Sequence, residues 1–506
     1  MNLRIQHNYT YFSINKEENP YEMYNYVQQA CKFEYSAFHR GNGEIIHQDK
    51  SLCLANLNLR KFPTGLFNKV VEEVPESIEL NIIDERNYKD IIEEQHAKFD
   101  YDFYDKQKLA IDIGIENRRG YYHIATGGGK TTIIATLLGH FKGKALVIVP
   151  SIDLVEQIGF DIFNALNEDI DFIIGKESIY ASQSRIKVAS VDTLDSSFDE
   201  LVSNGWLEQF NTIMLDEAHH ANFTKAKIIK KGGRIIRRIP QGYTGYYKIA
   251  MACPAENRFG FSATPEESEL FIQAVCGKKL IQIDEDYLIS IGRLAKPYIL
   301  IYKHKVPFYE DEKEATKNNI YLNENRNYML LKAIQTINQH DGTSLLMIDS
   351  KKFQLDLLRQ ISDEIIEVTG DTKLKERKRI YTQLENKEIN NIVLTVGKEG
   401  LNIPSVDAIV RGSAKKSERL VVQEKGRGAR VTKTKGKVLL IDTYDDDGVN
   451  KIQKEEYKWI TKVGHLRKHS EERLDIYKKT KASIIKIVET EEDFIDYINK
   501  FFNGEL

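Results

Sequence analysis

Residues 121–138 decide the fold of this chain, and they read YYHIATGGGKTTIIATLL. A short apolar strand runs into three consecutive glycines, and a run of helix-forming composition follows. Glycines between a strand and a helix let backbone N–H groups curl around a polyphosphate, and the helix presents the positive end of its dipole to it. We therefore expect a phosphate-binding loop, in which Lys130 meets the β- and γ-phosphates and the Thr131 hydroxyl ligates Mg²⁺. The alternative is a glycine-rich turn beside a solvated lysine, since Ile124 stands where such a loop usually has its first glycine.

Residues 212–220, TIMLDEAHH, form the second informative stretch. An apolar strand that ends in adjacent carboxylates places Asp216 and Glu217 at the carboxyl edge of a parallel sheet, where open α/β folds bind ligands. We expect Asp216 to hold Mg²⁺ and Glu217 to orient or deprotonate the attacking water. A solvated acidic pair at a strand end is the alternative for this stretch alone. In this order along the chain, the two stretches predict a nucleotide hydrolase.

Length and composition limit the class of protein. A chain of 506 residues allows about three domains, and 41% hydrophobic with 29% charged residues excludes a disordered or collagenous chain. The four cysteines form no C-x-x-C pair, so we expect neither a disulfide framework nor a structural zinc site. A formal charge of -3 excludes a histone-like polycation. Because no apolar run is long enough for a bilayer span or a secretory signal, we expect a cytoplasmic protein, in a bacterium or in the host of a phage.

Apolar strands alternate with helical patterns twice along the chain, with five short strands in each of residues 96–290 and 291–445. Such alternation predicts parallel sheets with crossover helices. Residues 1–95 mix short β-branched runs with turn residues, and residues 446–506 are rich in charge and helix formers. We therefore expect an α/β chain with an N-terminal accessory domain, two parallel-sheet domains and a helical C-terminal tail.

With these segments in place, the chain resembles the superfamily 2 helicases over nearly all of residues 100–445. The glycine loop is similar to motif I of the branch that holds the XPB-like helicases and the ResIII-like restriction motors, and residues 216–219 resemble the DExH box. Four further stretches resemble the Q motif, motif Ia, a later DNA-contacting motif and motif III: residues 103–110, 149–157, 189–194 and 261–265. The resemblance implies two tandem RecA-like domains, ATP as the nucleotide and Mg²⁺ as its metal.

The resemblance also implies roles for residues of the first parallel-sheet domain. ATP is bound by Gln107, which reads adenine, and by the loop residues Thr126, Gly127, Gly128, Gly129, Lys130, Thr131 and Thr132. Nucleic acid is contacted by Pro150, Ser151, Gln157, Ser190 and Thr193. The state of the γ-phosphate is relayed to the nucleic acid by His219, Ser262 and Thr264.

The second parallel-sheet domain carries the remaining motifs in order. Residues 344–350, 368–371, 395–404 and 423–430 resemble motif IV, the block that follows it, motif V and motif VI. The resemblance implies that the catalytic residues Gln423, Arg427 and Arg430 reach the ATP, where the arginines stabilise the charge on the transferring phosphoryl group. It also implies a nucleic-acid contact for Thr395 and a coupling role for Gly400. For the arginines, the alternative is surface salt bridging.

Residues 224–239, TKAKIIKKGGRIIRRI, carry seven basic residues and no acidic one. Isoleucine pairs on both sides of a Gly-Gly turn predict a β-hairpin with a basic surface. This hairpin is interpreted either as a prong that contacts phosphates and separates strands, or as a solvated charged hairpin. The residues that would contact phosphates are Lys230, Lys231, Arg234, Arg237 and Arg238.

Two terminal segments resemble one branch of the family. Residues 60–67, RKFPTGLF, with the aromatic and basic residues of 33–40, are similar to the small N-terminal domain of the UvsW-like phage branch-migration helicases. Residues 469–477 resemble a tail segment of the same branch. Basic and aromatic residues suit contact with duplex or junction DNA, although the aromatic residues can equally serve packing alone.

The resemblance implies a monomeric 3′-to-5′ enzyme that remodels forks, Holliday junctions or R-loops in recombination, replication or repair. Its partners are then DNA, including RNA–DNA hybrids, and other recombination or replication proteins. The alternatives are the motor subunit of a restriction or defence complex, an RNA helicase, and a nucleic-acid-binding scaffold without catalysis. The intact set of motif residues argues against the scaffold.

Overall fold

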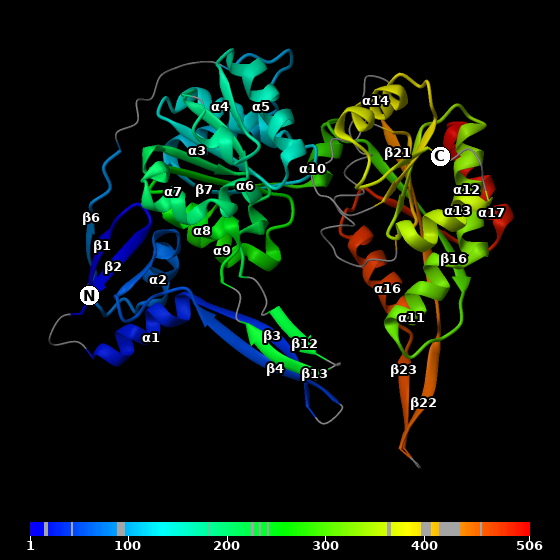
Figure 1. The fold of residues 1–506 in the computed structure, drawn as a ribbon, viewed down its shortest axis with the longest axis horizontal. Coiled ribbons are helices and arrows are strands. Elements are labelled where there is room, and N and C mark those ends of the chain that lie inside the picture. The colour runs from blue at the N-terminus through cyan, green and yellow to red at the C-terminus, as the bar shows by residue number, and fades with distance from the viewer. Residues whose placement is uncertain are drawn as a thin grey trace. The chain divides into compact units, whose positions relative to one another are not determined.

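The computed structural model shows an α/β protein whose elements divide into two compact units (Figure 1). The first unit comprises Met1–Ile124 and Gly129–Ile283, and the second comprises Asp284–Leu506 with the loop residues Ala125–Gly128. The residues that the structure describes are 1–14, 19–41, 44–88, 97–181, 183–223, 227–231, 234–239, 242–361, 366–395, 406–413, 436–455 and 458–506.

A seven-stranded sheet forms the centre of the first unit, and all its strands are parallel. The strand order is β15-β7-β14-β11-β8-β10-β9, with α3, α4 and α5 on one face and α6 to α9 on the other (Figure 1). The strands are β7 (Arg119–Ile124), β8 (Ala145–Val149), β9 (Ile170–Ile173), β10 (Ile186–Ser190), β11 (Thr212–Leu215), β14 (Asn257–Ser262) and β15 (Lys279–Ile283). The helices are α3 (Asp105–Asn117), α4 (Lys130–His140), α5 (Ile152–Leu166), α6 (Val191–Ser196), α7 (Phe198–Ser203), α8 (Gly245–Ala252) and α9 (Glu269–Cys276).

The central strand β8 explains why the sheet is covered on both faces. Every residue of this strand, ALVIV, is buried, which is the pattern of a parallel strand between two helix layers. The next helix, α5, begins after Ser151 and ends at Asn167, which adopts a left-handed conformation with φ 53°. The predicted strands of this domain are therefore confirmed, and β9 and β15 extend the sheet beyond them.

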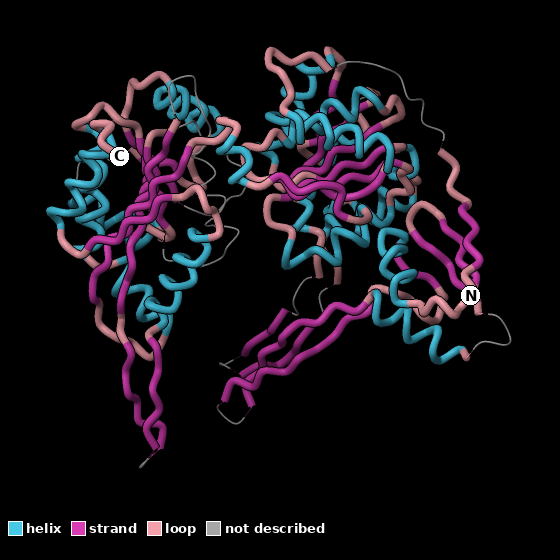
Figure 2. The backbone as a smooth tube through the Cα atoms, turned by 180° about the vertical axis from the view of Figure 1, so that it is seen from behind, coloured by secondary structure: helices cyan, strands magenta, loops and turns pink. Residues whose placement is uncertain are grey.

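A smaller four-stranded sheet, in the order β5-β2-β1-β6, forms the N-terminal part of the first unit. Strand β1 pairs with β2 antiparallel and with β6 parallel. Two antiparallel hairpins, β3–β4 and β12–β13, also belong to this unit (Figures 1 and 2). These elements are β1 (Asn2–Ile5), β2 (Tyr9–Ser13), α1 (Pro20–Ala30), β3 (Lys32–Gly41), β4 (Glu44–Cys53), β5 (Lys61–Pro63), α2 (Phe67–Glu73), β6 (Asn81–Asp84), β12 (Lys227–Lys231) and β13 (Arg234–Ile239).

A buried arginine ties the N-terminal part to the large sheet. Arg258 on β14 is 1% exposed, and it donates hydrogen bonds to the carbonyl oxygens of Ala250, Cys253 and Val275. It also donates to the side-chain oxygen of Asn8 at 2.9 Å. Because one guanidinium satisfies groups of both parts, the N-terminal domain and the first sheet form a single body.

The second unit is built around another parallel sheet, in the order β18-β19-β17-β20-β21-β16-β24. Its strands are β16 (Lys296–Lys305), β17 (Ser344–Ile348), β18 (Glu367–Val368), β19 (Asn391–Thr395), β20 (Ala408–Arg411), β21 (Lys437–Asp446) and β24 (Ile484–Val488). An antiparallel hairpin is formed by β22 (Val449–Glu455) and β23 (Lys458–Val463). The helices are α10 (Glu285–Ser290), α11 (Glu312–Thr316), α12 (Glu324–Asn338), α13 (Asp356–Ile361), α14 (Leu374–Glu385), α16 (His465–Lys478) and α17 (Glu491–Phe502).

Alternate residues of the second sheet face two separate cores. Leu300 and Leu346 pack in a core with residues of α12, α13 and α17. Their neighbours Ile299 and Leu345 pack in a second core with residues of α14 and α16. This alternation is what a doubly covered sheet requires, because successive side chains of a strand point to opposite faces. Two tandem RecA-like domains and a small N-terminal domain are therefore the observed fold.

The segment after residue 445 contains the expected helices, α16 and α17, and strands in addition. Strand β24 pairs with β16 in register from Tyr298 against Ile484, so the segment extends the second sheet. The sequence did not predict this strand. It lies at the edge of the sheet, where Ile484 and Ile487 are exposed, so it lacks the continuous apolar run of an inner strand. Among the described residues, no helix is both long and apolar enough to cross a membrane.

Candidate ATP-hydrolysis site

The candidate site lies where parallel strands of the first sheet end. Strand β7 leads into the glycine loop, β8 into Ser151, β11 into Asp216, and β14 ends at Ser262. Because these strands are parallel neighbours, their carboxyl ends meet at one edge of the sheet. The fold therefore brings together residues that are more than a hundred positions apart in the sequence.

The loop ends at Gly129, which has φ 81° and precedes the first residue of α4, Lys130. Such a left-handed conformation favours glycine. A Cβ atom on Gly129 would also lie 2.6 Å from the side-chain nitrogen of Gln107, so the Gln107 amide would have to shift to accept another residue there. Gln107 is itself buried on α3, so the predicted adenine reader packs directly against the predicted phosphate loop.

Lys130 forms ion pairs with both carboxylates of the second motif. Its ammonium nitrogen lies 2.5 Å from Glu217 Oε1 and 3.8 Å from Asp216 Oδ1. Burial lowers the pKa of Lys130, but the two carboxylates outweigh burial and hold the pKa above its ordinary value. The lysine therefore stays charged, and its side chain is already at the sheet edge to which the loop leads.

The pKa values of the two carboxylates are shifted in opposite directions. Burial raises the pKa of Asp216 to about 6, with the neighbouring Glu217 adding to the rise and Lys130 opposing it. Burial also raises the pKa of Glu217, but the closer Lys130 and His219 outweigh it, so this pKa lies below its ordinary value. Glu217 is therefore the more strongly ionised of the pair, as a group that orients or deprotonates water must be.

Two oxygens at this edge are suited to a metal or to water. In the described part of the chain, Asp216 Oδ1 and Glu217 Oε2 are buried and accept no hydrogen bond. Buried polar atoms normally have a partner, so oxygens of this kind fit a divalent cation or an ordered water. The Thr131 hydroxyl belongs to the first turn of α4, next to Lys130, and completes a donor set of the type that Mg²⁺ prefers.

The DExH box and motif III are joined by a hydrogen bond. His219 Nδ1 lies 2.9 Å from Ser262 Oγ, and the backbone N–H of Thr264 donates to the same hydroxyl at 3.1 Å. His219 Nδ1 is also 3.3 Å from Glu217 Oε2. A change at Glu217 can therefore be transmitted through His219 to the chain segment that follows β14.

The predicted nucleic-acid contacts of the first domain fall into two groups. Ser151 is the residue before α5, without a capping hydrogen bond from its side chain, Pro150 precedes it, and Gln157 lies in the second turn of the helix. All three residues are partly exposed. Ser190 and Thr193, in contrast, are buried, and their hydroxyl groups lie 2.8 Å apart at the start of α6. The first group is therefore partly exposed, although the hydroxyl oxygen of Ser151 is buried, and in the second group Ser190 Oγ caps α6 by accepting from the Thr193 N–H.

The basic stretch forms the predicted hairpin. Strands β12 and β13 pair antiparallel, with Lys231 opposite Arg234 and Ile228 opposite Arg238. The backbone therefore places Lys230, Lys231, Arg234, Arg237 and Arg238 on the paired strands. Thr395 is the last residue of β19, at the carboxyl edge of the second sheet. Four predicted site residues lie outside the described residues: Gly400, Gln423, Arg427 and Arg430.

Two tyrosines support the site and were not expected from the sequence. The hydroxyl of Tyr101 lies 2.7 Å from Thr132 Oγ1 on α4, and the hydroxyl of Tyr246 donates to the backbone oxygen of Asp216 at 2.9 Å. A signal existed for Tyr101, because aromatic residues alternate at Phe99, Tyr101 and Phe103 immediately before α3 and their rings are in contact. Nothing near Tyr246 in the sequence connects it to Asp216.

Two family models match the chain in the order that the motifs require. Residues 78–267 match the model described as "Type III restriction enzyme, res subunit", and residues 326–432 match the "Helicase conserved C-terminal domain". Together they cover more than half of the chain and include the loop, both carboxylates and motif VI. The chain belongs to the superfamily 2 helicases. The members of this superfamily are enzymes that couple ATP hydrolysis to work on nucleic acid.

Among curated proteins, this helicase is similar to the "Putative ATP-dependent helicase IRC3" of Saccharomyces cerevisiae, with 26% identity over 67% of this chain and 51% of the yeast protein. The chain thus spans about half the length of that relative. It is 24% identical to the "DNA 3'-5' translocase XPB2" of Sulfurisphaera tokodaii, over 74% of this chain and 76% of the archaeal protein.

Solved structures with the same fold include the Type ISP restriction-modification enzyme LlaBIII bound to DNA. It matches with a TM-score of 0.54 and 14% identity, over 84% of this chain and 35% of the LlaBIII chain. T4 UvsW matches over 97% of this helicase and 100% of the UvsW chain, with a TM-score of 0.41 and 19% identity.

Proposed function

We propose that this helicase is an ATP-dependent DNA translocase that remodels branched DNA, such as forks, Holliday junctions or R-loops, during recombination, replication or repair. The observation that carries the motor part of the proposal is the cluster of Lys130, Asp216 and Glu217 at one sheet edge, with Glu217 connected to Ser262 through His219. The name of the archaeal relative, a DNA 3'-5' translocase, supports DNA as the track and 3′-to-5′ as the direction.

The described residues at the sheet edge are proposed to bind the phosphates, hold the metal and orient the attacking water. When ATP enters, the Lys130 ammonium exchanges its contact with Glu217 for the phosphates, which are a stronger anion. The Thr131 hydroxyl and Asp216 would hold Mg²⁺, and the metal would supply neutralising charge at the phosphates. Glu217, released from Lys130, orients a water for attack. Gln423, Arg427 and Arg430 are proposed to stabilise the transferring phosphoryl group.

The hydrogen bond between His219 and Ser262 is proposed to couple ATP hydrolysis to a conformational change. Once Glu217 changes its partner, the electrostatic surroundings of His219 change, and so does the contact that holds Ser262 and Thr264 in place. A switch of this kind couples the state of the nucleotide to the strand-end loops, where Pro150 and Ser151 are partly exposed. Thr395 and Gly400 are proposed to serve the same coupling and the DNA contact in the second unit.

A comparison of DNA substrates tests the proposed function. We expect ATP hydrolysis to be stimulated at least about tenfold more by forks and four-way junctions than by blunt duplexes of equal length, because remodelling enzymes engage strands that leave a duplex at an angle. Phosphate release should be measured on single strands, blunt duplexes, forks, junctions and RNA–DNA hybrids at one salt concentration. Stimulation by single-stranded RNA alone would identify an RNA helicase instead. Equal stimulation by all DNA substrates would contradict branched DNA as the substrate.

The motor subunit of a restriction or defence complex is the second candidate, because the model that matches residues 78–267 describes a restriction-enzyme subunit. The chain should be expressed from its own genomic locus and purified. Stable co-purification of a nuclease or a methyltransferase with it would support this candidate. A chain that purifies as a monomer and remodels junctions alone would support the first. In both cases the proposed place of work is the cytoplasm of a bacterium or of a phage host.

The basic hairpin provides a separate prediction about DNA affinity. If Lys230, Lys231, Arg234, Arg237 and Arg238 contact phosphates, their replacement by alanine should lower the slope of log affinity against log salt by about one unit per lost contact. The measurement is fluorescence anisotropy with fork DNA between about 50 and 200 mM salt, a range over which log affinity falls linearly with log salt. A slope equal to that of the wild-type protein would show that these basic residues face solvent and do not contact phosphates.

A further inference from the structure

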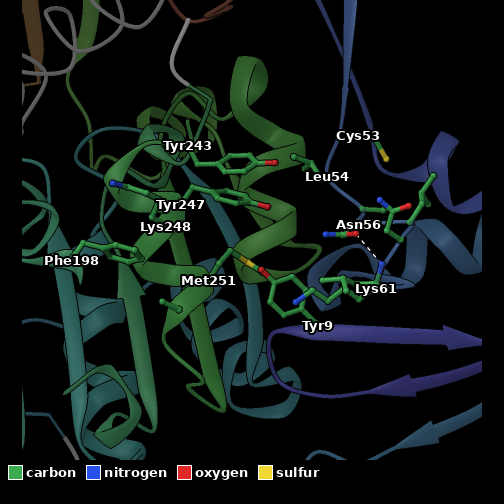
Figure 3. Close-up of a pocket in the computed structure, with 15 residues that line it drawn as sticks. Tyr9, Cys53, Leu54, Asn56, Lys61, Phe198, Tyr243, Tyr247, Lys248 and Met251 are labelled. Carbon is green, nitrogen blue, oxygen red and sulfur yellow. Dashed lines mark hydrogen bonds between the residues drawn. The ribbon is translucent and has the colours of Figure 1, made fainter. Parts of the chain in front are cut away.

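A pocket lies between the N-terminal domain and the large sheet of the first unit (Figure 3). Its volume is about 700 Å³, which falls within the range of about 300–1,000 Å³ that is typical of small-molecule sites. One wall comes from the loop between β4 and β5, and the other from α8 and the residues beside it. The pocket is distinct from the ATP site, with which it shares no residue.

The α8 wall of the pocket is aromatic. The rings of Tyr243 and Tyr247 stack with centroids 4.2 Å apart, and Figure 3 shows both hydroxyl groups directed toward the loop that contains Leu54 and Asn56. Tyr9 lies at the base of this wall. Burial raises the pKa of all three phenols, so they remain neutral and can donate hydrogen bonds. A flat ring that enters the pocket can therefore stack and form hydrogen bonds at once.

The charges of the pocket favour an anionic ligand. None of the fifteen lining residues, all of them in the described part of the chain, carries a carboxylate. Two of them are lysines. Lys61 lies over the Tyr9 ring, 3.9 Å from its centroid, and Lys248 is paired with Asp195 at 2.6 Å just outside the lining. Lys61 is thus the cation that a phosphate entering the pocket would meet.

The mouth of the pocket is exposed and lies at the base of both hairpins. Strand β4 ends at Cys53, which lines the pocket, and Tyr243 follows β13 by four residues. Leu59, at the tip of the β4–β5 loop, is 61% exposed, and Asn58 beside it is also exposed. A strand of nucleic acid that follows the basic β12–β13 hairpin would therefore reach this mouth.

We propose that this pocket holds one unpaired nucleotide of the DNA substrate, with its base against the aromatic wall formed by Tyr9, Tyr243 and Tyr247 and its phosphate near Lys61. The proposal rests on the proposed function as a DNA motor, and it assigns a role to Lys61, which the ATP site does not use. Base stacking on aromatic side chains with a basic residue at the backbone is the usual chemistry of single-strand binding. It would let the helicase hold a displaced base while the motor moves.

Photo-crosslinking tests where the unpaired strand lies. A fork whose unpaired arm carries 5-iodo-deoxyuridine at successive positions is irradiated with the full chain, and the adducts are mapped by mass spectrometry. We expect adducts on Tyr9, Tyr243 or Tyr247 at one position of the arm. Adducts confined to residues outside the pocket, at every position of the arm, would overturn the proposal.

Affinity for the same fork tests the pocket without relying on its buried residues. Asn58 is exposed, so Asn58→Asp adds a carboxylate at the mouth without disturbing the core, whereas Asn58→Lys adds an ammonium. We expect Asn58→Asp to weaken binding and Asn58→Lys to strengthen it, each by about threefold to tenfold at low salt. Tyr243→Ala should weaken binding by about tenfold or more, and Tyr243→Phe by much less, because the ring remains.

Tyr21→Ala is the matched control, since Tyr21 is 86% exposed on α1 and lies outside the pocket; its affinity should equal that of the wild type. Unchanged fork affinity in both Asn58 variants and in Tyr243→Ala would overturn the proposal. This is the result expected if the pocket binds a peptide instead of a nucleotide. That result differs from failure of the proposed function, in which wild-type ATP hydrolysis shows no stimulation by the fork.

Discussion

Replacing Glu217 by glutamine should lower the rate of ATP turnover by about 10²- to 10⁴-fold, while nucleotide binding is retained. Glutamine keeps the size of the side chain but cannot accept a proton from water. It also removes the carboxylate that lies 2.5 Å from Lys130, so the ammonium becomes free to meet the phosphates. The measurements are phosphate release with a saturating fork and titration with a fluorescent ATP analogue.

Two companion variants make this result interpretable. Lys130→Ala should lose both turnover and nucleotide affinity, because the lysine contacts phosphates in the ground state and in the transition state. Glu208→Gln changes an exposed glutamate of the same unit and should leave turnover unchanged. Turnover near the wild-type rate in Glu217→Gln or Lys130→Ala would contradict the assignment of the site.

Arg326→Met should destabilise the second unit by about 3–5 kcal/mol, which is the usual result of breaking a buried ion pair. Arg326 on α12 is fully buried and binds Asp445 Oδ1 at 3.0 Å, Thr443 Oγ1 at 2.8 Å and the backbone oxygen of Gly412 at 3.0 Å. Methionine fills a similar volume but removes one of the three cations, Arg326, His304 and Arg473, that balance the buried Asp445 carboxylate. For a unit of this size, calorimetry should show a fall in Tm of about 10 °C.

Arg359→Met provides the control for this prediction. Arg359 pairs with Glu367 at 2.6 Å, but its side chain is 46% exposed, and exposed pairs contribute at most about 1 kcal/mol. We therefore expect a fall in Tm of less than about 4 °C. Equal falls in Tm in the two variants would show that the buried Arg326 pair stabilises the fold no more than an exposed pair does.

The pH dependence of the Arg326→Met effect follows from Asp445. Burial alone would raise the pKa of Asp445, but Arg326, His304 and Arg473 outweigh it and hold the pKa well below its usual range. A carboxyl with a depressed pKa stabilises the fold above its unfolded pKa of about 4, and this contribution is lost as pH falls below that value. Without Arg326 the pKa of Asp445 rises, so the difference in Tm between wild type and variant should be largest near pH 7 and should narrow as pH falls below about 4.

The sequence predicts the catalytic cluster well because each part of it is local. The loop from Gly127 to Thr131 and the pair Asp216–Glu217 are contiguous, and each follows a buried strand whose apolar residues are easy to recognise. That these two segments meet then follows from the parallel sheet, in which all carboxyl ends share an edge. The pairing of His219 with Ser262 is not local, and only the family resemblance indicated it.

Two of the strands that the sequence did not predict share a physical reason. Strands β15 and β24 lie at sheet edges, where most of their residues are exposed or only partly buried, so they lack the continuous apolar run of an inner strand. The buried arginines Arg258 and Arg326 were missed because arginine is usually exposed, and because their partners lie far away in the sequence. The pocket at Tyr243 arises from two domains in contact, which no single segment encodes.

The way the second sheet is assembled has a practical consequence for anyone who divides this protein into pieces. The helicase C-terminal match stops at residue 432, yet β21 sits between β20 and β16, and β24 closes the far edge. A fragment trimmed to the matched residues would lose the strands β16, β21 and β24, the helices α16 and α17 and the apolar contacts that these helices make. Expression trials should therefore keep the chain through Phe502, and a shorter version is expected to be insoluble.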